Sequence, residues 1–309
     1  MKISYNSCSS MNKKGIFFTS IAILIISLLI ITYTVYTKAE ERRTIQRRIE
    51  TMNSFINSLD QDISRKIFIA GFRSIFTFEN KIIESGSYIS DVNDGFQEMF
   101  FNGSLNGNTQ TIMAGATLSD IIDSISAIGG KVNINVSLTN ASIFMDQTDP
   151  WNVRIKLIGN LTIKDSGNLA HWERELSTES FVPIYYFDDP IYTINTGGIV
   201  IQKINETVYT TFDSATLLTH TQENYYKSST DAPSFLDRLQ GNITSSNENG
   251  IESLVDLQEL DNKGISISQK SIVDHVYFSS SNPASCQPSG MPSWFYLDNN
   301  HLALYNSSC

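Results

Sequence analysis

The amino-acid sequence predicts an α+β protein, in which a long N-terminal helix, first transmembrane and then amphipathic, precedes a mixed, mainly antiparallel β-sheet domain with short helices. Three observations lead to this prediction. An uncharged apolar run of 22 residues lies near the N-terminus. A heptad-like apolar stripe follows it, and apolar and polar residues alternate in short segments of the rest of the chain. Helices repeat their faces every 3.6 residues and strands every two, so these patterns predict different elements.

Composition and charge exclude some classes of protein. Hydrophobic residues make up 41 % of the 309 positions, which is enough for a packed core and excludes wholesale disorder. The net charge is −10, and an acidic chain argues against a nucleic-acid partner. Residues 1–86 carry 12 basic and 7 acidic side chains, whereas residues 87–309 carry 10 and 25. The two parts are therefore expected to lie in different environments.

Residues 16–37 are predicted to form a transmembrane helix in contact with membrane lipid. As a helix this run is about 33 Å long, which is sufficient to cross the hydrocarbon layer. A buried core helix is the first alternative, but helices of soluble proteins rarely run this far without a charge. A cleavable secretory signal is the second, yet Lys38-Ala-Glu-Glu follows where a small-x-small cleavage site would stand. We expect the helix to remain attached to the chain.

The orientation of this helix is predicted by criteria that disagree. Basic residues flank it on both sides: Lys2, Lys13 and Lys14 before it, and Lys38, Arg42, Arg43, Arg47 and Arg48 after it. The positive-inside rule, applied to these residues, would keep the C-terminal side in the cytoplasm. The acidic, Ser/Thr/Asn-rich composition of residues 87–309 and their two cysteines favour the opposite side. We expect a single-pass membrane protein with an extracytoplasmic C-terminal domain.

The N-terminal leader, residues 1–15, is short and basic and ends in Met11-Asn-Lys-Lys-Gly15, directly before the apolar helix. This arrangement resembles the class III signal peptide of type IV prepilins. The resemblance implies that a prepilin peptidase cuts between Gly15 and Ile16, and that the helix then serves as a filament core or a membrane anchor. Bacterial-type pilins have Glu five residues after the cut, where this chain has Ser20. The alternative is a plain signal anchor, and Met11 is an alternative start.

Three segments of the remaining chain resemble uncharacterised archaeal pilin-like, membrane-anchored surface proteins. They are residues 187–192 (FDDPIY), 250–255 (GIESLV) and 290–295 (GMPSWF). That resemblance implies a cell-surface location and like subunits as partners through the N-terminal helix, and it implies no activity.

Residues 38–86 are predicted to continue the helix as an amphipathic stalk. Apolar residues recur at spacings of four and three from Ile45 to Ile63, and Glu84-Ser-Gly86 provides a C-terminal stop. The stripe is expected either to pack on the chain's own domain or to pack against identical helices. For residues 64–83 the first interpretation is favoured because the stripe widens there with several Phe residues, and for 38–63 the choice stays open.

Residues 87–309 are predicted to form the α+β domain, as one domain or two small ones. A capping-box pattern at Thr117-Leu-Ser-Asp120 begins a helix that Gly129-Gly130 is expected to stop. Residues 132–138 and 153–157 alternate as half-buried strands, and Leu161 and Ile163 continue on a second strand or past a bulge near Gly159. Further strands are expected at 181–186, 199–204, 207–211, 276–279 and 295–297, and short helices at 232–239 and 251–260.

Cys286 and Cys309 are predicted to form a disulfide, with free thiols as the alternative. A bridge over 23 positions would stabilise the chain end by about 3 kcal/mol and requires an oxidising compartment. Seven N-x-S/T sequons are possible glycosylation sites, a number close to the chance expectation for this composition. They begin at Asn102, Asn135, Asn140, Asn160, Asn205, Asn242 and Asn306.

No catalytic motif is found, and no catalytic residue, metal site or cofactor is predicted. The chain has four His, and Asp274-His275 is the one adjacent acid–His pair. A calcium site that joins Asp188 and Asp189 to Asp146 or Asp149 is one interpretation of these acids, and a turn at Pro190 is the favoured one. We therefore expect a pilin-like surface protein without catalysis. The alternatives are a surface binding or adhesion module on a signal anchor and, third, an extracytoplasmic enzyme, which a pocket gathering His275 or Asp188 with other acids would favour.

Overall fold

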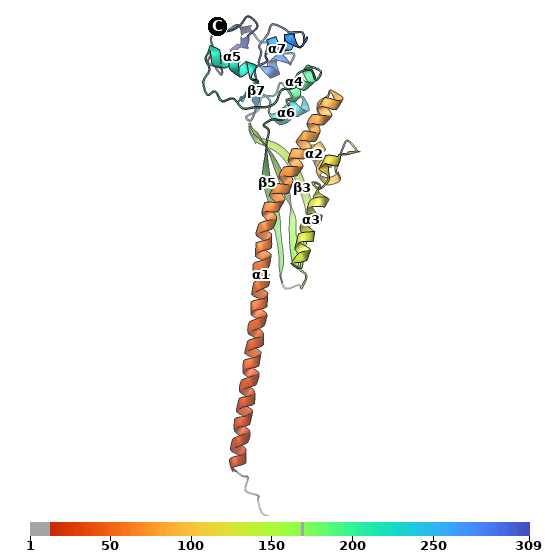
Figure 1. Cartoon of the computed structure of the whole chain (residues 1–309), viewed down its shortest axis with the longest axis vertical. Coiled ribbons are helices and arrows are strands. Elements are labelled where there is room, and N and C mark those ends of the chain that lie inside the picture. Colours follow the sequence, from red (N-terminus) through yellow and green to blue (C-terminus); the bar gives the residue numbers. More distant parts are fainter. Residues whose placement is uncertain (1–12, 168–169) are drawn as a thin grey trace, which may run out of the picture.

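The first and longest element is the helix α1 (Lys13–Ser85), which has 73 residues and is therefore about 110 Å long. The computed structural model describes residues 13–167 and 170–309, and side chains within those ranges from residue 17 onward. In Figure 1 the lower half of α1 projects away from the rest of the molecule, and its upper half lies against a sheet. The helix ends at Gly86, whose positive φ and N–H bond to Ile82 O form the predicted stop.

The projecting half of α1 is apolar and exposed. Every described side chain from Phe17 to Tyr36 is exposed to the surroundings of the molecule. Two helical stretches of the described chain are long and apolar enough to cross a membrane, one in α1 and one over residues 111–131. The second packs Ile121 and Ile125 into the core, whereas the apolar window of α1 is not buried anywhere. α1 therefore fits a single membrane anchor.

The apolar stripe of α1 is partly exposed at its N-terminal end and buried against the domain further along. Ile45 and Ile49 are 42 % and 39 % exposed, whereas Met52, Leu59 and Ile63 are buried under the chain's own sheet and helices. The stripe therefore packs on its own domain from Met52 onward. In the segment 64–83 Ile67 and Phe78 are buried as predicted, whereas Phe72 and Phe76, which widen the stripe, are 45 % and 41 % exposed. The packing of Met52, Leu59 and Ile63 also decides part of the segment 38–63, where the choice was open.

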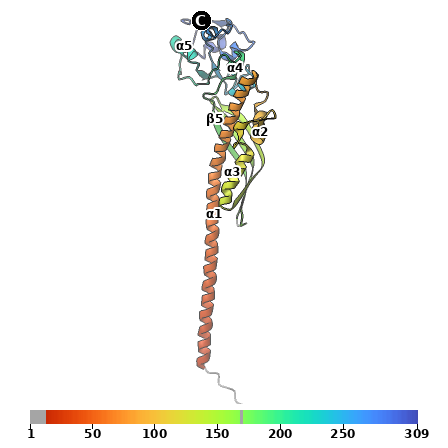
Figure 2. The same ribbon diagram turned by 45° about the vertical axis from the view of Figure 1, so that its right-hand side comes forward.

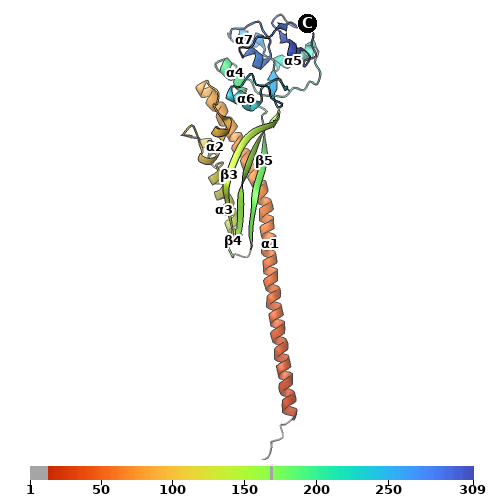
Figure 3. The same ribbon diagram turned by 180° about the vertical axis from the view of Figure 1, so that it is seen from behind.

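A three-stranded antiparallel sheet supports α1, and helices cover one of its faces. Its order is β3-β4-β5, with β3 (Ile134–Asp149), β4 (Asn152–Asp165) and β5 (His171–Pro183). Figure 3, seen from behind, shows the uncovered face in front of α1, α2 and α3. Gly71 lies where α1 crosses the sheet, and a Cβ there would stand 2.6 Å from Ile155 Cγ1. The absent side chain lets helix and sheet approach closely.

The helix α3 (Leu118–Lys131) lies along β3 and begins with the predicted capping box of Thr117 and Asp120. It does not stop at its two glycines, because Gly129 and Gly130 lie in its last turn. A Cβ on Gly129 would stand 2.7 Å from the Ile134 carbonyl oxygen, so this glycine allows the helix to contact the strand. Four shorter elements precede α3 along the chain: α2 (Val92–Asn102), the hairpin strands β1 (Ser104–Leu105) and β2 (Asn108–Thr109), and the 3₁₀-helix η1 (Thr111–Met113).

The strand that carries Leu161 and Ile163 is the same strand as residues 153–157. β4 runs unbroken, and the register shift lies on its partner β3, between Thr139 and Ser142. Gly159 faces this bulge, and a Cβ there would stand 2.9 Å from Leu138 Cδ1. The predicted irregularity is therefore real but belongs to the neighbouring strand.

Residues 184–309, the distal region, lie at the end opposite to the N-terminus (Figures 1 and 2) and consist of short elements. They have a second apolar core that includes Leu254, Val273 and Phe295. Phe235 and Ile251 instead join the apolar core of the helix–sheet body, which consists of α1 from Met52 onward, α2, α3 and the strands β3, β4 and β5. The elements are α4 (Pro190–Asn195), α5 (Ser214–Gln222), β6 (Tyr226–Ser228), α6 (Phe235–Gln240), β7 (Ile251–Ser253), α7 (Leu257–Asn262), α8 (Asp274–Tyr277), β8 (Ser285–Cys286), β9 (Leu297–Asp298) and α9 (Asn299–Leu302).

Several predicted elements of the distal region are wrong or shorter than expected. Residues 199–204 and 207–211 form no strand; Lys203 in the first segment makes an isolated bridge, and so does Glu206, which lies between the two segments. Residues 276–279 are not a strand, because a turn of helix, α8, covers Asp274–Tyr277 and includes the first two of them. Strand structure at the other two sites is limited to residues 181–183 of β5 and to Leu297–Asp298 of β9.

The two short helices expected here are also displaced. The segment 251–260 divides into β7 and α7, since the Asp256 carboxylate accepts hydrogen bonds from Gln258 N and Glu259 N and starts a helix only there. The segment 232–239 becomes helical at Phe235, after the capping box of Ser234. In both cases a capping side chain decides the boundary.

Candidate functional site

A buried cluster of one glutamate and two histidines lies in the distal region. Glu252 comes from β7, His275 from α8 and His301 from α9, and their exposed fractions are 0 %, 7 % and 4 %. Glu252 Oε2 lies 3.4 Å from His301 Nε2 and 3.9 Å from His275 Nε2. One ligand atom from each residue lies within 4.8 Å of the other two. Three short elements thus direct three metal-binding groups at one point.

These groups lack ordinary hydrogen-bond partners among the described residues. The unpartnered atoms are both carboxylate oxygens of Glu252 and the Nε2 atoms of His275 and His301. Glu252 lies within ion-pair distance of both histidines, but buried polar atoms without a hydrogen bond are rare in folded proteins. Their gathering at one point indicates a site for a ligand.

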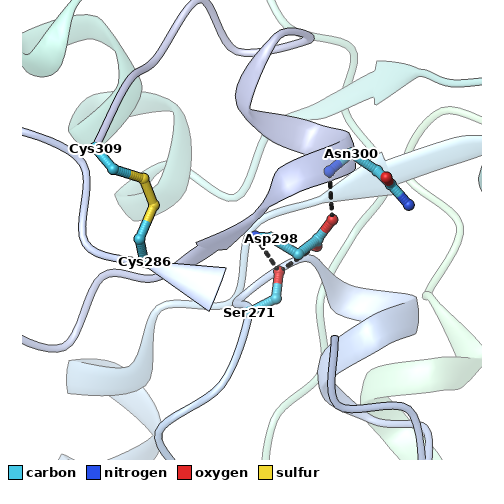
Figure 4. Close-up of a disulfide and its surroundings, with 5 residues drawn as sticks. All are labelled: Ser271, Cys286, Asp298, Asn300 and Cys309. Carbon is cyan, nitrogen blue, oxygen red and sulfur yellow. Dashed lines mark hydrogen bonds between the residues drawn. A yellow bond between two sulfur atoms is a disulfide. The ribbon is translucent and has the colours of Figure 1, made fainter. Parts of the chain in front are cut away.

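A second carboxylate, Asp298, orients one of the histidines. Its Oδ1 lies 2.7 Å from His301 Nδ1 and also accepts a hydrogen bond from Asn300 N. Ser271 Oγ donates to the other oxygen, Oδ2, at 2.6 Å, as Figure 4 shows. Because His301 Nδ1 faces Asp298, the other ring nitrogen, Nε2, faces Glu252.

The electrostatics of the cluster favour charged groups. Burial by itself would raise the pKa of Glu252, but its contacts with His275 and His301 outweigh burial and hold that pKa well below its usual range. Burial would lower the pKa of His301, yet Asp298 and Glu252 together raise it to about 10. In the absence of another cation, a proton on His301 therefore offsets part of the negative charge.

The cluster is reached from a hollow of about 480 Å³ at the surface of the distal region. His275, His301 and Asp298 line it, together with polar residues such as Asn282 and Asn300. Glu252 does not line the hollow and lies behind the two histidines, fully buried. A small ion or molecule in the hollow would therefore meet the imidazole rings first.

A buried ion cluster adjoins the site. Arg238 Nη1 donates to Asp189 Oδ2 at 2.5 Å and to Asp274 Oδ2 at 2.9 Å, and none of the three side chains is exposed. Asp274 also accepts from the backbone N–H of His275 and Ser253. Burial raises the pKa of Asp189, and the charge of Arg238 opposes this rise. This cluster fixes the backbone on which His275 and Glu252 stand.

The predicted disulfide between Cys286 and Cys309 is present. Cys286 lies on β8, which pairs with β9, where Asp298 is opposite Ser285. Both Asp298 and His301 lie inside the loop that the disulfide closes, and Figure 4 shows the disulfide beside the strand of Asp298. The covalent bond therefore limits the movement of two residues of the cluster.

The other residues predicted from the sequence lie elsewhere. The bond between Gly15 and Ile16 falls in the first turn of α1, and cleavage there stays a prediction. Glycosylation also stays a prediction, although each of the seven sequon asparagines is exposed. In the sheet, Asn135 lies on β3 and Asn160 on β4.

The aspartates weighed as a calcium site have separate partners. Asp146 pairs with Arg154, and Asp149 accepts from Trp151 N. Asp188 pairs with Lys203, while Asp189 caps α4 through Ile191 N, as the favoured turn interpretation predicts. Each of the four carboxylates is therefore already held by side-chain or backbone donors.

Sequence reasoning missed Glu252 and the role of His301. The three residues of the cluster lie 23 and 26 positions apart in the chain, so no short ligand motif marks them. The signals were the pair Asp274-His275 and the position of His301 near Cys309. Comparison with protein-family models, curated proteins and solved structures finds no match for this chain.

Proposed function

We propose that this chain is a pilin-like, membrane-anchored cell-surface protein, whose apolar helix holds the outer domain at the membrane or in a filament. The exposed apolar half of α1 is the single observation that carries this proposal. Residues 17–36 present apolar side chains on every side, so lipid or other copies of the helix must cover them. In Figure 1 this half of the helix projects away from the sheet and from the distal region.

The continuity of α1 supports a rigid connection between anchor and domain. Arg48 marks the point where the helix meets the sheet, with an ion pair of 2.7 Å to the buried Asp165 and a bond to Val132 O. From Phe17 to Arg48 the helix extends roughly 45 Å, and its described side chains are exposed along most of this length. A helix of this kind would hold the distal region far from the membrane surface.

The mature N-terminus of the protein taken from membranes is the direct test. A start at Ile16, found by intact mass and terminal peptides, supports prepilin-type processing and an extracytoplasmic domain. Gly15→Leu should then leave the leader attached, whereas Ser20→Ala, five residues after the bond, should not. A start at Met1 or Met11 in the wild type would overturn the processing and favour a surface binding module on a signal anchor.

Assembly is tested separately, because processing does not require it. Cross-linking in membranes through single cysteines at Ile45 or Ile49, the exposed part of the stripe, would report contact between helices of like subunits. The control is a cysteine at Glu50, on another side of the helix. Cross-links from the stripe alone favour a filament or oligomer, and their absence favours a monomeric anchor.

A further inference from the structure

We propose that Glu252, His275 and His301 bind a divalent transition-metal ion, with Zn²⁺ as the ion that fits best. Both kinds of ligand, imidazole nitrogen and carboxylate oxygen, belong to the usual ligand set of zinc. The site is distinct from the anchor helix, and the proposal does not depend on filament assembly.

The spacing of the ligand atoms suits a tetrahedral ion. Bonds of 2.0–2.2 Å in tetrahedral geometry place ligand atoms about 3.4 Å apart. The Glu252–His301 distance is 3.4 Å and the Glu252–His275 distance is 3.9 Å. Small rotations of buried side chains are enough to bring all three atoms onto one ion, because they already lie within 4.8 Å of one another.

The charge of the cluster also suits a dication. Two carboxylates, Glu252 and Asp298, face the two imidazole rings in a site closed off from most solvent. A dication bound by two neutral imidazoles would be attracted by both carboxylates. The metal would also supply partners for the nitrogen and oxygen atoms that otherwise lack them.

The surroundings hold the ligands as metal sites require. Asp298 accepts from His301 Nδ1, an arrangement that orients a metal-binding histidine and increases its basicity. Ser271 and the disulfide of Cys286 and Cys309 hold Asp298 in turn. The protein contributes three ligands, and in zinc sites with three protein ligands water takes the fourth position.

Metal titration of the full-length protein in detergent tests the proposal. The protein would carry Cys8→Ser, to remove the one thiol outside the disulfide, and no polyhistidine tag. After treatment with a chelator, Zn²⁺ should bind at one ion per chain and raise the midpoint of thermal unfolding, and EDTA should reverse that rise. Co²⁺ should give the visible absorption of a tetrahedral site, and Ca²⁺ or Mg²⁺ should not displace it.

Variants assign the ligands. Glu252→Gln and His275→Gln should lower Zn²⁺ affinity more than 100-fold, and Asp298→Asn about 10- to 100-fold. The matched control is His171→Gln, an exposed histidine on β5 far from the cluster, which should leave affinity unchanged. Equal affinity of the wild type and Glu252→Gln would overturn the proposal.

A measurement on the wild type alone covers the case in which these variants do not fold. X-ray absorption of the Zn²⁺-loaded protein should show two imidazole nitrogens and oxygen ligands around the ion. A shell without imidazole would show that the ion binds elsewhere on the protein and would overturn the proposal. A chelator-treated wild type that takes up no Zn²⁺ would overturn it as well.

Discussion

The helix–sheet body and the distal region are stabilised in different ways. In the body, strands of 13 to 16 residues and long helices satisfy their own backbone groups around a large apolar core. In the distal region no helix exceeds nine residues and no strand exceeds three. There Arg238, Asp189, Asp274 and Glu252 are fully buried, and a disulfide closes the chain end.

The difference shows what replaces regular structure when elements are short. Short helices and strands leave many backbone N–H and C=O groups without intra-element partners. Buried side chains supply those partners: Asp274 accepts from Ser253 N and His275 N, and Arg238 donates to the Ile251 carbonyl oxygen. Side chains that perform this task also bring polar groups together inside the protein, which is how a metal-binding cluster arises there.

The largest effect is expected from Arg238→Met. The change leaves Asp189 and Asp274 buried without their cation and should destabilise the distal region by about 3–5 kcal/mol. Hydrogen exchange by mass spectrometry should show loss of protection in peptides of residues 184–309 and little change in the sheet. The triple variant that adds Asp189→Asn and Asp274→Asn should recover part of the loss. An equal loss in β3 to β5 would show that the two regions unfold as one unit.

Replacing both cysteines of the disulfide by Ser is expected to lower the free energy of unfolding by about 3 kcal/mol, because the loop of 23 positions is no longer closed. Asp298 and His301 lie in that loop and should become more mobile, so Zn²⁺ affinity should also fall. Thermal unfolding with and without reductant measures the effect. The double Ser variant is the control, since reductant should not change its unfolding.

The pH dependence of stability should reveal one buried carboxyl of the body. Burial, with the charge of Asp188, raises the pKa of Glu79 from 4.5 to about 8. Between these values the folded state retains a proton that the unfolded state loses, so stability falls as pH rises from 4.5 to 8. Glu79→Gln should remove this fall and make the variant more stable than the wild type at pH 9. The control, Glu84→Gln on the exposed end of α1, should keep the wild-type slope in denaturant titrations.

The smallest changes in stability are expected from substitutions of two adjacent glycines of α3, Gly129 and Gly130. Gly129→Ala places a Cβ 2.7 Å from the Ile134 carbonyl oxygen and should destabilise the body by about 1–2 kcal/mol. Gly130→Ala meets no atom within 4 Å and should stabilise the helix by about 0.5–1 kcal/mol. Denaturant unfolding followed by fluorescence of Trp151 and Trp172, which pack on the body core, measures both. The same sign for both variants would contradict this description of the helix–strand contact.

The sequence alone determined the features that depend on near neighbours in the chain. The apolar run of residues 16–37, the stop at Gly86, the capping box of Thr117 and the alternation of β3 and β4 were all predictable. Each follows from a local pattern of hydrophobicity or from a side chain that bonds to the backbone within four residues. The pairing of Cys286 with Cys309 was predictable by count, since the third cysteine precedes the membrane segment.

Only the tertiary structure decided the distal region and its cluster. The strands expected at 199–204 and 207–211 are absent, since Lys203 makes the one isolated bridge among their residues. Glu252, His275 and His301 meet because packing brings together β7, α8 and α9, which are far apart along the chain. Side-chain contacts between residues so far apart in the chain leave no periodic signal in the sequence. They depend on the position of the backbone, which bonds of Arg238 and Asp274 fix in this region.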